Sequence, residues 1–297
     1  MGIYEQIDSN KRKSFFLIFL FFILVIIIGL VIGLYYGNIY FGPILALIIG
    51  TLYFLVSYYS GDSMILAMTK AKAVDKKQYP HLVHTVEGLS IAAGIPMPKT
   101  YVIDDDALNA FATGRDPEHA SITVTTGLLN KMNRLELEGV IAHEMSHIKN
   151  FDIRIMMLAA VMVGLTVLLS DFLLRSFFWG SGRRRSGNNR LTVILIVTGF
   201  VLAILSPLIG EAIKLAISRK REFLADADGA LLTRYPKGLA DALRKIKKDP
   251  DPLVDYANKA TAHLFISTPF RKKQSFMVKL FATHPPIDQR ITALDKM

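Results

Sequence analysis

The chain has 297 residues, of which 52% are hydrophobic, and its mean hydropathy of +0.36 is too high for an ordinary soluble domain of this size. It contains no cysteine, which excludes disulfides and thiolate chemistry, so any metal must be bound by histidine, aspartate or glutamate. The formal net charge is +10, and much of it flanks apolar runs, at Lys11-Arg12-Lys13 and Arg183-Arg184-Arg185. In the absence of an aromatic and basic recognition module, this charge indicates contact with anionic lipid headgroups and no nucleic-acid binding.

Four apolar runs predict membrane helices. Residues 15–34 form an uncharged run of 20 residues, which as a helix reaches across a hydrocarbon core of about 30 Å. The other runs cover 41–59, 155–170 and 191–210, so the four helices form two hairpins. In the first run, Gly29 and Gly33 form a GxxxG pair, which either lets another helix approach closely or only reflects the frequency of glycine in membrane helices.

The polar regions predict a mixture of helix and strand. A helix is expected over 81–93, because Gly94 and Pro96 end its periodic pattern. Short β-rich stretches follow at 100–103, 109–113 and 121–125, and a second helix is predicted over 135–149. After the last apolar run, helices are expected over 222–232, over 237–246 and from Pro286 onward, since proline suits a first turn.

The two polar regions together have about 170 residues, the size of one compact domain. We therefore expect a single domain that a membrane hairpin interrupts. Residues 1–60 form the first hairpin, 61–154 the first half of this domain, 155–216 a second transmembrane or membrane-associated hairpin, and 217–297 the second half. The expected fold class is an α-helical integral membrane protein with about four transmembrane helices and a mainly helical, α+β domain that carries a small β-sheet.

The sequence His143-Glu144-Met145-Ser146-His147 lies in the helix predicted over 135–149. Residues four apart on a helix are separated by about 40° around its axis, so both imidazoles lie on one face, as two zinc ligands require. Glu144 lies beside the first ligand, where it can accept a proton from a metal-bound water. The alternative is a pair of exposed helix histidines beside a surface glutamate. The pattern favours a zinc hydrolase.

Zinc hydrolases usually have a third protein ligand and leave the fourth position to water. The segment 218–226 offers Glu222 and Asp226, four residues apart on one helix face. Such a pair is usually only a solvated face, and it becomes informative here because it accompanies the two histidines.

Three motifs in order resemble those of the HtpX family of bacterial membrane metalloproteases, which is related to the CAAX prenyl proteases. They are His143-Glu144-Met145-Ser146-His147, Arg221-Glu222-Phe223-Leu224-Ala225-Asp226 and Thr283-His284-Pro285-Pro286. The resemblance covers nearly the whole chain. It implies a zincin-like metalloprotease domain, one Zn²⁺ per chain and hydrolysis of peptide bonds.

The same resemblance implies roles for single residues. Glu222 is implied to be the third zinc ligand, and Asp226 to orient a zinc-bound imidazole through its outer nitrogen. His284 is implied to stabilise the oxyanion of the tetrahedral intermediate. An edge strand beside the cleft, to which substrate adds as an extended strand, is implied to include Asn109, Ala110, Phe111 and Ala112.

Positive charge beside the first run predicts the orientation. Lys11, Arg12 and Lys13 place the N-terminus in the cytoplasm, and two crossings return the chain there. Both halves of the interrupted domain must then face the cytoplasm, because His143 and Glu222 share one metal. A full third crossing would export the cationic loop over 183–190, so either the first hairpin dominates the orientation or the second hairpin does not cross fully.

The leading interpretation is a zinc-dependent endopeptidase of the bacterial plasma membrane that cuts membrane proteins or unfolded polypeptides at the cytoplasmic face. The resemblance implies a role in stress response and in the quality control of membrane proteins. The other interpretations are a CAAX-type peptidase acting on a lipidated C-terminus and a non-hydrolytic metal transporter. A transporter would place its ligands near the midplane of its membrane helices.

Overall fold

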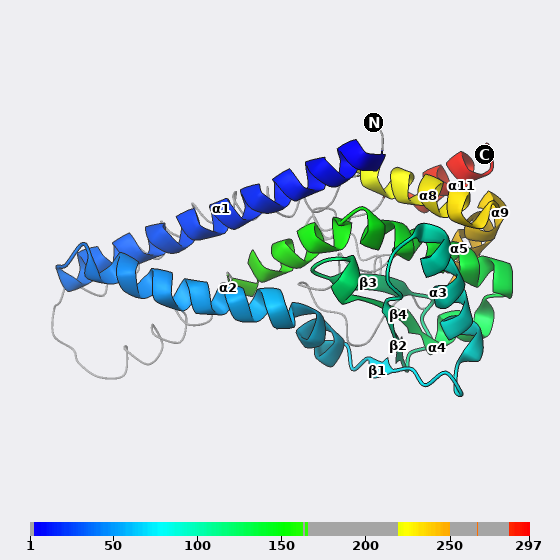
Figure 1. The fold of residues 1–297 in the computed structure, drawn as a ribbon, viewed down its shortest axis with the longest axis horizontal. Helices are drawn as coiled ribbons and strands as arrows, with labels where there is room; N and C mark the ends of the chain where they lie inside the picture. The colour runs from blue at the N-terminus through cyan, green and yellow to red at the C-terminus, as the bar shows by residue number, and fades with distance from the viewer. Residues whose placement is uncertain (1–2, 163, 166–218, 250–265, 267–284) are drawn as a thin grey trace.

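The computed structural model describes residues 3–162, 164–165, 219–249, 266 and 285–297. A long helical hairpin projects from a group of shorter helices and one small sheet (Figure 1). The hairpin consists of α1 (Ile3–Tyr36) and α2 (Phe41–Met68). The helical hairpin predicted from the first two apolar runs is therefore confirmed, and each helix extends beyond its run.

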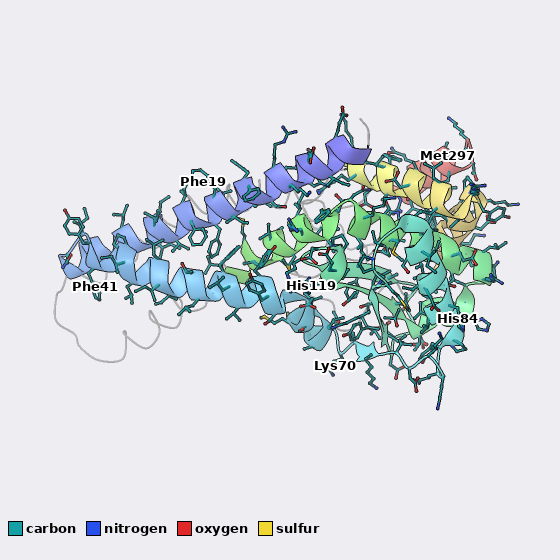
Figure 2. All side chains as sticks on the ribbon, viewed as in Figure 1. Phe19, Phe41, Lys70, His84, His119 and Met297 are labelled. Carbon is teal, nitrogen blue, oxygen red and sulfur yellow. The ribbon has the colours of Figure 1, made fainter. Side chains whose placement is uncertain are left out.

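Both helices are long and apolar enough to cross a membrane, over Ile7–Leu30 in α1 and over the whole of α2. Their outer faces carry large apolar side chains, among them Phe19, which is 62% exposed, and Phe41 at the tip (Figure 2). Exposed apolar surface along helices of this length is stable in lipid and costly in water.

The two hairpin helices approach each other closely near their connection. A Cβ atom on Gly29 would lie 2.5 Å from the Cα of Pro43, and one on Gly33 would lie 2.7 Å from the carbonyl oxygen of Asn38. No side chain fits at either position. Of the two interpretations of the GxxxG pair, the structure supports close helix approach.

A further helix, over residues 152–162, runs from the sheet region into the space beside α1 and α2. Its buried side chains, including Ile155, Leu158 and Met162, share a cluster with Leu17 and Phe21 of α1. This helix contains the start of the third predicted membrane run, 155–170. Within the described residues two helices, α1 and α2, have the length and hydropathy of a membrane span; the rest of the third run and all of the fourth lie outside those residues.

The sheet has four strands in the order β1 (Lys72–Ala73), β2 (Lys99–Ile103), β4 (Ala120–Thr125) and β3 (Ala110–Gly114). Strands β2 and β4 are parallel, and the other pairs are antiparallel. The three predicted strands are confirmed, and β3 lies at an edge. The sequence did not predict β1, because two residues are too few to show a periodic pattern.

The helices around the sheet are α3 (Pro80–Ala93), α4 (Thr126–Lys131), α5 (Arg134–Lys149), α8 (Arg219–Thr233), α9 (Pro236–Lys248) and α11 (Ile287–Leu294). All of them except the short α4 were predicted. One hydrophobic core joins residues from both sides of the 155–216 interval, including Val140 and Ile141 of α5, Leu239 and Leu243 of α9, and Ile291 of α11.

Candidate metal centre

Helix α5 places both histidines of the HExxH sequence inside the domain. The helix begins with a capping box, in which the Asn133 side chain accepts from the backbone N–H of Glu136 and the Glu136 carboxylate accepts from that of Asn133. His143 is fully buried and His147 is 4% exposed. The alternative interpretation of two exposed histidines is therefore wrong.

Helix α8 brings a carboxylate to the same point. A Cβ atom on Gly229 would lie 3.0 Å from the backbone nitrogen of His143, so α8 approaches α5 almost to backbone contact. The carboxylate oxygens of Glu222 lie 3.7 Å from Nε2 of His143 and 3.5 Å from Nε2 of His147. The two Nε2 atoms are 3.2 Å apart. His143, His147 and Glu222, called the metal group below, could thus hold one ion.

These separations fit a tetrahedral ion. Ligand atoms about 2.0–2.1 Å from such an ion lie about 3.3 Å from one another. The donor set of two imidazoles and one carboxylate is the set found in catalytic zinc sites. It leaves a fourth position for water.

A carboxylate contacts the outer nitrogen of each histidine. Nδ1 of His143 lies 3.0 Å from Asp226, and Nδ1 of His147 lies 3.0 Å from Asp152. Such partners fix the tautomer and direct Nε2 toward the metal position. The sequence drew attention to Asp226 but missed Asp152, which follows the end of α5 and matches no motif.

Arg290 is the second residue that the sequence missed. It is fully buried, and its Nε and Nη2 atoms donate to the two carboxylate oxygens of Asp226 at 2.9 and 2.7 Å. Its Nη1 lies 3.7 Å from Glu222, and its Nη2 lies 3.3 Å from the His143 ring. The sequence does contain a signal that Arg290 is buried. It falls on the apolar face of α11, which is marked by Ile287, Ile291 and Leu294.

Burial and neighbouring charges set the protonation of the centre. Burial and the Arg290 guanidinium lower the pKa of His143 to about 4. Burial also disfavours charge on His147, but the hydrogen bond to Asp152 and the charge of Glu222 outweigh it and raise that pKa to about 9. For Asp226, Arg290 and His143 outweigh the opposing effect of burial and lower the pKa to about 2. The carboxylates thus favour positive charge at His147, whereas burial and Arg290 keep His143 neutral, the form of imidazole that binds a metal.

The structure places the other predicted residues as follows. Glu144 is 2% exposed, and its charge contributes to the raised pKa of both His147 and Arg290. Asn109 is buried directly before β3, and its side-chain oxygen accepts from the N–H of Ala110. Residues 110–112 form the first part of the edge strand β3, which packs against α5. His284 lies outside the described residues.

Comparison with known proteins identifies the family of the chain. Residues 76–297 match the model of peptidase family M48. Over 99% of its length the chain is 48% identical to a protease HtpX homolog of Dictyoglomus thermophilum, of which it covers 94%, and 45% identical to one of Listeria monocytogenes, of which it covers 100%. The crystal structure of S. mikatae Ste24p matches 82% of this chain and 58% of that protein, with 21% identity and a TM-score of 0.46. The chain belongs to peptidase family M48, among the HtpX membrane metalloproteases.

Proposed function

We propose that this membrane endopeptidase uses one Zn²⁺ ion to cleave membrane proteins or unfolded polypeptides at the cytoplasmic face of a bacterial plasma membrane. The observation that carries the proposal is the convergence of His143, His147 and Glu222 at tetrahedral separations, with a carboxylate behind each imidazole. Substrates of this class agree with a role in the quality control of membrane proteins.

The ligand type supports zinc, and the location of the ligands supports catalysis. Borderline-soft imidazoles with one carboxylate suit Zn²⁺ better than Mg²⁺ or Ca²⁺, which prefer oxygen ligands alone. When bound, zinc lowers the pKa of a water molecule and polarises the substrate carbonyl. The metal group lies on α5 and α8, outside the membrane-length helices α1 and α2, which argues against a transporter.

Glu144 is the proton carrier in this proposal. Its carboxylate accepts a proton from the attacking water while the water oxygen bonds to the scissile carbonyl carbon. The same proton then passes to the leaving amine as the C–N bond breaks. Asp226 and Asp152 hold the imidazoles, and the resemblance assigns His284 to the oxyanion.

Strand β3 is the proposed docking edge for the substrate backbone. It pairs with β4 on one side, and the carbonyl oxygen of Ala110 accepts from the N–H of Ile266 on the other. Outward-facing groups recur every second residue along an antiparallel edge, so Ala112 offers the next outward N–H and C=O. A substrate added there lies against α5, since β3 packs on that helix.

The contacts of α1 support a shared side for the N-terminus and the active site. The side chain of Asn10, near the start of α1, donates to Asp152, the partner of His147. The cationic residues 11–13 beside it favour the cytoplasm by the positive-inside rule. The core shared by α5, α9 and α11 supports our proposal that 61–154 and 217–297 are two halves of one catalytic domain.

Zinc-dependent cleavage of a denatured model substrate tests the proposal. The full chain in detergent should cleave it, lose this activity to a chelator and regain it on addition of Zn²⁺. Cleavage that persists in the metal-free protein would contradict the proposal.

A further inference from the structure

The turn that follows α5 has an unusual backbone conformation. Phe151 adopts φ of +58°, in the left-handed region that bulky residues rarely occupy. This turn follows the helix cap, Asn150, and ends at Asp152, whose carboxylate contacts Nδ1 of His147. The position of one histidine of the metal group therefore depends on how firmly the turn is held.

The N-terminal part of α1 contacts all three residues of this turn, 150–152. The side-chain amide of Asn10 donates to the carbonyl oxygen of Asn150 at 2.8 Å and to Asp152 at 2.7 Å. Nζ of the adjacent Lys11 lies 5.2 Å from the centre of the Phe151 ring. A membrane-length helix thus binds the turn that carries the partner of His147.

The side chain of Asn10 holds the turn as a hydrogen-bond donor. Both of its acceptors are oxygens, which fixes the orientation of the amide. Asn10 is fully buried, and among the described residues its own side-chain oxygen has no hydrogen-bond partner. Burying an unpaired amide oxygen is unfavourable, so packing alone would favour an apolar side chain at this position. The two hydrogen bonds that the amide donates explain why an asparagine is present. Besides Asn10 and Nδ1 of His147, Nη1 of Arg221 contacts Asp152, at the longer distance of 3.4 Å.

We propose that Asn10 is a positioning residue for the zinc ligand His147 and acts through Asp152. The amide holds the carboxylate in line with Nδ1 of His147, so that Nε2 points to the metal. The packing of α1 against the domain thereby contributes to zinc affinity. The inference rests on the proposed zinc site, and its test separates the two.

The test measures zinc affinity of the full-length protein in detergent, by competition with a chromophoric chelator. Asn10→Leu removes the donors at similar size, and we expect about tenfold weaker zinc binding, the lower end of the effect of losing an outer-shell partner. Ser14→Ala is the matched control. Ser14 is buried one turn further along α1 and donates to the backbone oxygen of Asn10 without contacting Asp152. The Ser14→Ala protein should therefore bind zinc like the parent.

A double-mutant cycle distinguishes positioning from general stability. In an Asp152→Asn background, Asn10→Leu should weaken zinc binding no further, because its route to His147 is already lost. Equal losses in both backgrounds, or parental affinity of Asn10→Leu, would overturn the inference while leaving the zinc site intact. Failure of the parent itself to bind zinc would instead refute the proposed function. Asn10→Ala also removes the donors and places no charge at this buried position, so it provides the same measurement if Asn10→Leu does not fold.

Discussion

Arg290 and Asp226 form a bidentate ion pair directly behind His143. The guanidinium donates to both carboxylate oxygens, and neither residue is more than 1% exposed. The pair joins α11 to α8, while Asp226 also contacts Nδ1 of His143. The C-terminal helix is therefore part of the structure that supports the metal group.

Replacement of Arg290 should affect both folding and metal binding. Arg290→Met leaves the Asp226 carboxylate buried without its partner, which costs about 3–5 kcal/mol of stability. Zinc affinity should fall as well, because Asp226 no longer has a fixed orientation. Thermal unfolding and zinc competition on the purified variant measure the two effects.

Arg244→Met is the control for that substitution. Arg244 makes a similar two-oxygen contact with Asp295, but at the exposed surface. Exposed pairs contribute little, so this variant should melt and bind zinc like the parent. If the two arginine variants lost equal thermal stability and equal zinc affinity, the burial of the Arg290–Asp226 pair would not explain the losses.

The roles of Glu222 and Asp226 should separate in metal content. Glu222 faces the Nε2 atoms of both histidines, whereas Asp226 contacts the opposite nitrogen of His143. Glu222→Ala should therefore lose zinc more readily than Asp226→Asn, which is expected to weaken affinity by about 10 to 100-fold. Metal analysis after dialysis decides between them. Parental zinc content in Glu222→Ala together with an empty Asp226→Asn would reverse the assignment.

The sequence predicted the elements whose signals are local. The apolar runs of α1 and α2, the periodic pattern of α5 and the HExxH spacing each lie within one segment, and all of these helices are present. The partner of His147 was not predictable in this way. Asp152 reaches it only because Phe151 takes a left-handed conformation, which a phenylalanine does not signal.

Two further residues show how polar positions on an apolar face could have been found. Asn10 precedes Ser14, Leu17 and Phe21 at helical spacing, and all four are buried in α1. Arg290 occupies the equivalent kind of position in α11. In both cases the sequence marks an unusual buried polar residue, but the identity of its partner depends on tertiary packing, which no local pattern contains.

The distance between α5 and α8 should control zinc binding. Gly229→Ala places a Cβ atom 3.0 Å from the His143 nitrogen and 3.2 Å from the carbonyl carbon of Ala142. The helices must move apart, which draws Glu222 away from the histidines. We expect weaker zinc binding, measured by chelator competition.

Gly88→Ala is the matched glycine variant. Gly88 lies inside α3, and a Cβ atom there would meet nothing within 4 Å. Alanine should stabilise that helix by up to about 1 kcal/mol and leave zinc affinity unchanged. Tighter or equal zinc binding by Gly229→Ala would contradict the close-packing account.

Reporter fusions test the proposed membrane orientation. Fusions after Arg134 and after Gln289 should both report the cytoplasmic side, because α5 and α11 share one core and the cationic residues 11–13 favour the cytoplasm. Two fusions on opposite sides would contradict the proposal of one catalytic domain in two halves.

Glu144→Gln provides the most direct test of the central claim, that a metal held by His143, His147 and Glu222 works with Glu144 as the proton acceptor. Glutamine keeps the size of the side chain and leaves the three ligands in place, but it cannot accept the proton. Zinc content and peptide cleavage should be measured on the same purified, full-length protein. We predict parental zinc content with cleavage lowered by about 10²- to 10⁴-fold or more. Near-parental cleavage by the zinc-loaded Glu144→Gln protein would contradict the account.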